Sequence, residues 1–175
     1  ARAAPRHLRA VHQDKQTMIP ITPDLQLLAN IIGTMRSAVN RNSGVCDQKI
    51  GPQSGVQADI DGALGELAFA KWKNVWPDLS LSVRSGSYDC VVTGTRVDVK
   101  TTRYLNGRLT ATLKQTADVD IYVLAIIDND CVRFPGYLRA SELRRDENIR
   151  DLGHGNTYCV EQEKLHKFSA FSSPH

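Results

Sequence analysis

The order of helical and extended patterns constrains the fold of this chain more than any single motif does. A helical pattern runs from a capping Asp24 to about residue 40, and a second begins near 59–61 and stops before Pro77. Helical pieces are also expected near 141–146 and 161–167. Between the second helix and these pieces lie short β-prone segments at 79–84, 88–93, 96–102, 109–113, 119–127 and 131–134. This order predicts an α/β domain with a central mixed β-sheet flanked by helices.

The first two predicted helices are joined by a polar segment at 41–58, which is rich in Asn, Ser, Gly and Gln. It is predicted to be a loop, and its length suggests a function. The first helix has apolar residues spaced as one helical face. That face consists of Leu25, Leu27, Leu28, Ile31, Ile32, Met35 and Val39.

The 175 residues fit a single domain at 18–175 that follows a flexible basic tail at 1–17. The tail has no apolar periodicity, and it is compatible with sequence that precedes a natural start at Met18. Its four basic residues and one acid account for the whole net charge of +3, so the domain itself is neutral. Total charge therefore does not indicate a polyanionic partner. A local basic cleft is still compatible with the clustering of Arg84, Arg96, Lys100, Arg103, Arg108 and Lys114.

Composition places the chain among globular proteins, because 41% of its residues are hydrophobic and 23% are charged. Its longest apolar run, at 121–127, is much shorter than the roughly 20 residues that cross a bilayer as a helix. No secretory signal pattern is recognisable, so we expect no membrane partner and a cytoplasmic location. No two cysteines have zinc-binding spacing, and free thiols are expected at Cys46, Cys90, Cys131 and Cys159.

Charged and apolar side chains alternate in the segment RVDVKTT at 96–102. On an extended chain Val97 and Val99 share one face, while Asp98 and Lys100 share the other. One interpretation is a half-buried strand with a solvated ion pair. The other is a site in which a carboxylate and an amine face the same cleft.

Further acids accompany this segment. Glu66 falls among the residues that the second helix would turn inward, although a surface Glu paired with a basic residue is the simpler alternative. Asp89 begins a strand, and a tight turn at 93–95 would bring it onto one face with Asp98. Two close carboxylates repel unless a cation lies between them, which predicts Mg²⁺ or Mn²⁺. Lys100 would then reach the scissile phosphate and the attacking water.

The helical Glu66, the strand-end Asp89 and the run Asp98-Val99-Lys100 resemble the PD-(D/E)XK nuclease superfamily, which has the restriction-endonuclease-like fold. The resemblance covers about half the chain, from the second helix to the last predicted strand. It implies an αβββαβ-type core. It also implies metal ligation by Glu66, Asp89, Asp98 and the Val99 carbonyl, with Lys100 as the catalytic lysine.

The resemblance further implies hydrolysis of DNA, with endonuclease action favoured. The segment VRFPGYLRASEL resembles the strand, turn and helix that follow the core in small, often phage-encoded members, which suggests a stand-alone nuclease in a bacterial or phage-infected cell. Two alternatives stay open: a non-catalytic module that binds nucleic acid or protein, and a junction- or flap-resolving nuclease. A homodimer is compatible with the class, although the sequence shows no evident self-complementary apolar stripe. Candidate nucleic-acid contacts are Arg41, Lys49, Tyr104, Arg108 and Gln115.

Overall fold

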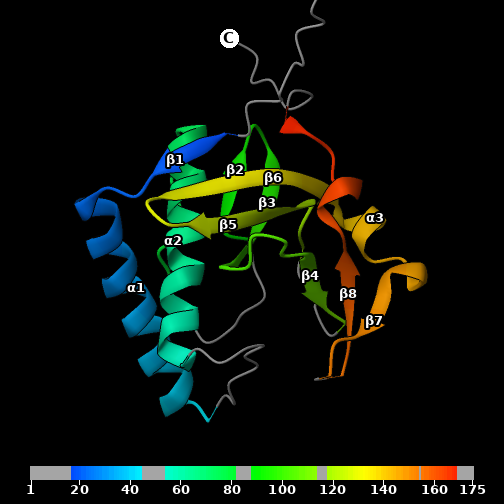
Figure 1. The fold of residues 1–175 in the computed structure, drawn as a ribbon. Helices are drawn as coiled ribbons and strands as arrows, with labels where there is room; N and C mark the ends of the chain where they lie inside the picture. The colour runs from blue at the N-terminus through cyan, green and yellow to red at the C-terminus, as the bar shows by residue number, and fades with distance from the viewer. Residues whose placement is uncertain (1–16, 45–53, 82–87, 114–117, 154, 169–175) are drawn as a thin grey trace, which may run out of the picture.

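A computed structural model gives the fold (Figure 1) and describes residues 17–44, 54–81, 88–113, 118–153 and 155–168. Its main sheet has five strands in the order β1, β6, β5, β3, β2. Strands β3 and β5 are parallel and the other neighbours are antiparallel, so the predicted α/β class with a mixed sheet is confirmed. The strands are β1 (Met18–Pro20), β2 (Cys90–Val92), β3 (Thr95–Thr102), β5 (Ile121–Asp128) and β6 (Cys131–Arg139).

Two long helices cover one face of this sheet, with α2 (Gly55–Lys73) between α1 (Pro23–Asn42) and the strands (Figure 1). Helix α1 is capped by Thr22, whose hydroxyl accepts the Leu25 N–H, and not by Asp24 as predicted. Helix α2 starts several residues before its predicted start because Ser54 caps it.

Two glycines allow these elements to approach closely. A β-carbon at Gly33 of α1 would collide with the backbone of Ile60 in α2. A β-carbon at Gly65 of α2 would collide with the side chain of Thr101 in β3. These contacts fix α2 against β3, and they place the residue after Gly65, Glu66, beside that strand.

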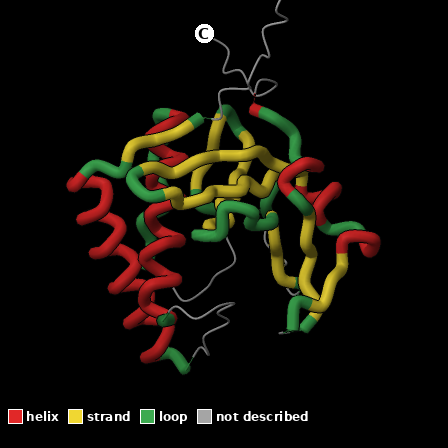
Figure 2. Tube along the Cα trace, in the orientation of Figure 1, coloured by secondary structure: helices red, strands yellow, loops and turns green. Residues whose placement is uncertain are grey.

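A second, three-stranded sheet and a short helix cover the opposite face of the main sheet (Figure 2). Apolar side chains alternate between the two faces of β5, and Val123 packs on the helical side while Tyr122 packs on the other. The second layer consists of β4 (Leu109–Thr112), β8 (Asn156–Val160) and β7 (Ile149–Asp151), with α3 (Ala140–Leu143) and the 3₁₀ turns η1 (Asp146–Asn148) and η2 (Gln162–Lys164).

Several predicted elements differ from the observed ones. The segment 79–84 forms no strand in its described part, and the bridge to Cys90 comes from Pro77, which precedes this segment. Strand β6 continues through the predicted turn after Phe134, and the helix expected at 161–167 is only η2. Strands β1, β7 and β8 were not predicted, because they are short and lack sustained alternation.

The connection from β3 to β5 also differs from the implied αβββαβ order. Where that order has a helix, the described part of this connection has β4, which belongs to the second sheet. Strand β4 pairs with β8, near the C-terminal end of the described chain. The second sheet therefore ties the β3 to β5 connection to the end of the fold.

The buried face of α1 is not the face that its large apolar residues predict. Of that set Leu25 and Ile32 are buried, together with the small residues Ala29 and Gly33, which face α2. Leu27, Leu28, Ile31 and Met35 of the set are exposed on the other side of the helix. The closest approach to α2 is at Gly33, which meets the backbone of Ile60 and leaves no room for a larger side chain. None of the helices within the described residues is both long and apolar enough to cross a membrane.

Candidate active site at the β2–β3 hairpin

A tight hairpin brings two of the predicted acids together. Thr93 and Gly94 connect β2 to β3 with φ angles of 47° and 82°, as expected for a two-residue turn. Cys90 pairs with Val97, so the residues just beyond this pair, Asp89 and Asp98, are neighbours across the hairpin. The predicted turn is confirmed, and it makes the two aspartates neighbours across the hairpin.

Strand β3 has the predicted alternation, but its charged face is not solvated. Val97 and Val99 are buried on the helical side. Asp98 is only 3% exposed, and its Oδ1 lies 2.8 Å from Nζ of Lys100, whose side chain remains 33% exposed. The interpretation as an ordinary surface ion pair is therefore wrong. A buried carboxylate carries a desolvation cost that a surface pair does not.

The outer edge of β3 is open next to this pair. Strand β2 pairs only with residues 95–97 of β3, so no other described strand pairs with the remainder of that edge. The N–H of Val99 instead donates to Oδ2 of Asp89 at 2.6 Å. Side chains from both faces of the sheet can meet at such an edge.

Glu66 approaches this edge from α2, and it is held by an arginine that the sequence did not indicate. Arg36 Nη1 lies 2.6 Å from Oε2 of Glu66, and the two side chains are only 20% and 14% exposed. The same guanidinium donates to the carbonyl oxygens of Asp78 at 2.8 Å and Ser80 at 3.3 Å. The available signal was spacing, because Arg36 follows Ala29 and Ile32 along the inner face of α1.

Electrostatics link these groups into one site. Burial raises the pKa of Asp89 well above its usual range, and repulsion from Glu66 and Asp98 raises it further. Burial also raises the pKa of Glu66 despite the attraction of Arg36. Burial alone would lower the pKa of Lys100, but the Asp98 carboxylate outweighs it and the pKa of Lys100 is raised. Lys100 is therefore a cation at neutral pH.

The donor chemistry of the site suits a hard divalent cation, since three carboxylates interact there with excess negative charge. Two of them already have cationic partners, Arg36 for Glu66 and Lys100 for Asp98. Within the described ranges no three His, Cys, Asp or Glu side chains converge closely enough to hold a metal ion. Ligation by all three would thus require Glu66 or Asp98 to exchange a partner.

Further polar contacts surround the site. Asp61 of α2 is 3% exposed and receives two hydrogen bonds of 2.6 Å from Arg103, just past the end of β3. This pair fixes α2 to the end of β3, five residues before Glu66 in the chain. Next to Asp98 in the sheet, the Tyr122 hydroxyl accepts a 2.5 Å hydrogen bond from Arg144. The Tyr122 ring also lies 5.9 Å from the Lys100 ammonium.

The predicted basic cleft does not form from its described members. Arg96 pairs with Asp118 and Asp120, and Arg103 pairs with Asp61. Lys100 pairs with Asp98, and Arg108 pairs with Glu161. Their carboxylate partners compensate these charges, so they do not form an uncompensated positive surface. Arg84 and Lys114 lie outside the described residues.

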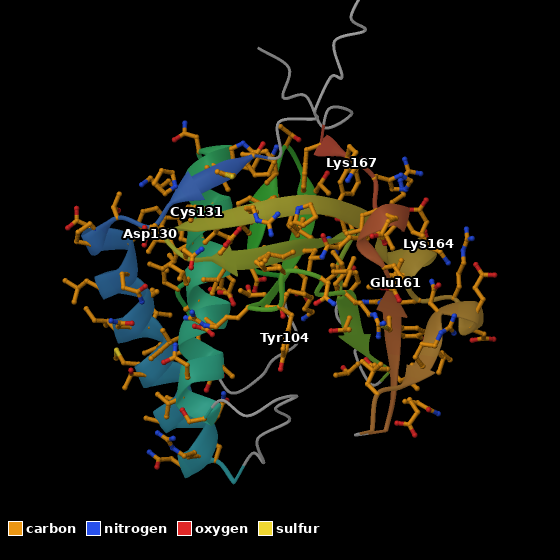
Figure 3. All side chains as sticks on the ribbon, in the orientation of Figure 1. Tyr104, Asp130, Cys131, Glu161, Lys164 and Lys167 are labelled. Carbon is orange, nitrogen blue, oxygen red and sulfur yellow. The ribbon has the colours of Figure 1, made fainter. Side chains whose placement is uncertain are left out.

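The predicted nucleic-acid contacts are scattered. Tyr104 is 56% exposed in the β3 to β4 connection, between the long helices and the second sheet (Figure 3). Arg41 is exposed in the last turn of α1, and Arg108 is engaged by Glu161. Lys49 and Gln115 lie outside the described residues. Cys90, Cys131 and Cys159 are free thiols as predicted, and Cys46 lies outside the described residues.

Comparisons of this chain with protein-family models, with curated proteins and with solved structures give no match. The case for a function therefore rests on the geometry and chemistry of the site itself.

Proposed function

We propose that this protein is a metal-dependent nuclease of the restriction-endonuclease-like class, which hydrolyses phosphodiester bonds in DNA, with endonuclease action favoured. One observation carries the proposal: the buried Asp98 is ion-paired with Lys100 at 2.8 Å, beside a second carboxylate, Asp89, whose pKa is raised. Such an arrangement costs stability, and strongly perturbed carboxylates of this kind are concentrated at functional sites.

The cofactor in this proposal is Mg²⁺ or Mn²⁺. Asp89 and Asp98 would hold the ion, with Glu66 and the Val99 carbonyl as the further ligands that the family resemblance implies. A bound ion of this type polarises a phosphate oxygen and lowers the pKa of a coordinated water. The raised pKa of Asp89 supports the assignment, because a cation at this point would relieve the repulsion among the carboxylates.

Lys100 acts in the proposed reaction as a fixed positive charge. Its raised pKa keeps it protonated at neutral pH, so it does not serve as a general base. Because its side chain is partly exposed, its ammonium can donate to a phosphate oxygen and orient the attacking water. Asp98 limits the positions of this ammonium by holding it at 2.8 Å, which favours stabilisation of charge that develops in the transition state.

Arg36 is assigned as a positioning residue for Glu66. Its guanidinium is anchored on the two backbone carbonyls of Asp78 and Ser80, and it holds the Glu66 carboxylate towards the open edge of β3. It also neutralises Glu66, so it would compete with a divalent cation for this carboxylate. Glu66 is then expected to bind a cation less strongly than it would without Arg36.

A specific observation favours a second candidate, a non-catalytic binding module on the same fold. Glu66 and Asp98 both have close cationic partners already, as acids of a purely structural cluster would. Thermal unfolding separates the two candidates, because a ligand that binds only the folded state raises the melting temperature. The nuclease predicts a rise with Mn²⁺ in the wild type that disappears in Asp98→Asn. The inert module predicts no rise in either protein.

The activity itself is tested by incubating the protein with supercoiled, linear, single-stranded and branched DNA, with and without Mn²⁺. Asp98→Asn is compared with Asp130→Asn, an exposed aspartate in the turn between β5 and β6 (Figure 3). The proposal predicts metal-dependent cleavage that is lost only in Asp98→Asn. Preference for branched DNA would identify a junction- or flap-resolving enzyme. Equal cleavage by both variants, or no cleavage by folded wild type, would reject the proposed site.

A further inference from the structure

The loop that follows the strand of the proposed site exposes two large apolar side chains. Tyr104 and Leu105 lie in the connection from β3 to β4, where they are 56% and 58% exposed. Tyr104 lies between the long helices and the second sheet (Figure 3). It follows Lys100 by four residues, so their α-carbons are at most about 14 Å apart. The exposed pair is therefore close to the proposed site.

The loop is ordered, although its tip faces solvent. The N–H of Gly107 donates to the carbonyl of Tyr104 at 2.8 Å and closes a turn. The side-chain amide of Gln162 in η2 donates to the carbonyls of Leu105 at 2.9 Å and Gly107 at 2.8 Å. Gly107 is buried, and a β-carbon there would collide with the side chain of Thr102. Because the backbone is already fixed, little ordering is needed when the exposed side chains bind a ligand.

An arginine whose plane is fixed precedes the exposed pair. Nε and Nη2 of Arg103 each donate to one oxygen of the buried Asp61 carboxylate at 2.6 Å. This contact at two points holds the orientation of the guanidinium, while the Arg103 side chain remains 50% exposed. Unpaired nucleic-acid bases stack on aromatic rings and on arginine planes, and both are present here on consecutive residues.

Charge compensation narrows the kind of nucleic acid that fits this loop. Binding of a duplex depends mainly on basic residues that neutralise its phosphates. The arginines at the two ends of the loop, Arg103 and Arg108, are ion-paired with Asp61 and Glu161. The loop therefore offers flat and apolar side chains with little net charge. Such a surface suits bases that are unpaired, because the faces of paired bases are covered within the helical stack.

We propose that Arg103, Tyr104 and Leu105 form a stacking platform for unpaired DNA bases beside the scissile phosphate. Single-stranded, bubble-containing or branched DNA is then the preferred substrate. The platform binds the strand through its bases, while Lys100 contacts the phosphate. This inference rests on the proposed function, which supplies DNA as the ligand.

Fluorescence anisotropy in EDTA, where a metal-dependent nuclease does not cut, measures the dissociation constants of three labelled DNAs. They are a duplex, the same duplex with an unpaired bubble, and a single strand. Tyr104→Ala is expected to weaken binding of the bubble and of the single strand by about 5- to 100-fold, as loss of one base–aromatic stack predicts. Tyr104→Phe keeps the ring and is expected to bind as wild type does. The control is Trp76→Ala, which removes an aromatic side chain that is 81% exposed outside the loop, and it is expected to change no dissociation constant.

Cleavage with Mn²⁺, measured separately, distinguishes failure of the platform from failure of the proposed function. If wild type cuts none of the DNAs but binds the bubble through Tyr104, the platform stands and the nuclease is rejected. If wild type cuts DNA but Tyr104→Ala binds and cuts the bubble as well as wild type does, the nuclease stands and the platform is overturned. Equal affinity of wild type for duplex and bubble also overturns it. Binding of none of the three DNAs does the same and would favour a protein partner for the exposed pair.

Discussion

Replacement of Arg36 by methionine removes the cation that holds Glu66 at the site. The ion pair of 2.6 Å is lost, together with the hydrogen bonds to the carbonyls of Asp78 and Ser80. Breaking a fully buried pair costs about 3–5 kcal/mol, because it leaves one charge uncompensated. The residual exposure of 20% and 14% for the two side chains favours the lower end. We therefore expect a loss of about 3 kcal/mol, which corresponds to roughly 6–12 °C in melting temperature for a chain of this size.

The assay is thermal and urea unfolding of Arg36→Met next to Arg145→Met, whose arginine is exposed and pairs only with the exposed Glu147 among the described residues. Adding Glu66→Gln to Arg36→Met is expected to recover about 1–2 kcal/mol, because a neutral side chain needs no counter-charge. Equal losses in the two arginine variants, or no recovery in the double variant, would refute the argument that Arg36 compensates a buried carboxylate.

The pH dependence of Arg36→Met provides an independent check. Burial raises the pKa of Glu66 in the folded state, and Arg36 opposes this rise. Without Arg36 the folded state holds the Glu66 proton more tightly, so the destabilisation should shrink as the pH falls through the raised pKa. Below the unfolded pKa of about 4.3, Glu66 is protonated in both states and only the loss of the carbonyl contacts remains. A pH-independent difference from wild type would contradict this reasoning.

Two further predictions concern the stability of the site. The pKa of Asp89 is raised on folding, so ionisation of this carboxyl destabilises the fold. Asp89→Asn should therefore have a higher melting temperature than wild type at neutral pH. The difference in melting temperature should disappear as the pH falls to about 4. A lower melting temperature at pH 7 would contradict this sign. Gly65→Ala should destabilise by about 1–3 kcal/mol because the new methyl meets Thr101. The control is Gly62→Ala, whose β-carbon would meet only Glu66 Oε1 at 4.0 Å. It should be neutral or stabilising by up to about 1 kcal/mol in the same unfolding assay. Equal changes in unfolding free energy for the two alanine variants would show that the collision with Thr101 is relieved without cost.

The hairpin could be predicted from the sequence because its determinants are local. Thr93-Gly94 supplies the positive φ angles of the turn, and alternation along β3 fixes which side chains share a face. Arg36 could not be predicted as part of the site, because its contact with Glu66 depends on how α1 packs across α2. That packing is decided by Gly33 against Ile60, a tertiary contact with no periodic signal.

The α1 pattern could be interpreted only in part for a related reason. Spacing groups its large apolar residues on one helical face, but the close helix crossing buries only Leu25 and Ile32 of them, together with small residues such as Ala29. Strands β7 and β8 were missed because their pairing joins segments that are weakly patterned on their own. Short strands of this kind are defined by their partners more than by their own composition.

The proposed role of Lys100 is to supply a fixed positive charge to phosphodiester hydrolysis at the carboxylate cluster. Its most direct test is the single-turnover rate of DNA cleavage with Mn²⁺ for Lys100→Met, compared with Lys164→Met, an exposed lysine in η2 (Figure 3). Loss of one transition-state donor predicts a rate lower by about 10²–10³ in Lys100→Met alone, with the fold retained. A Lys100→Met protein that remains folded and cleaves as fast as wild type would contradict the claim.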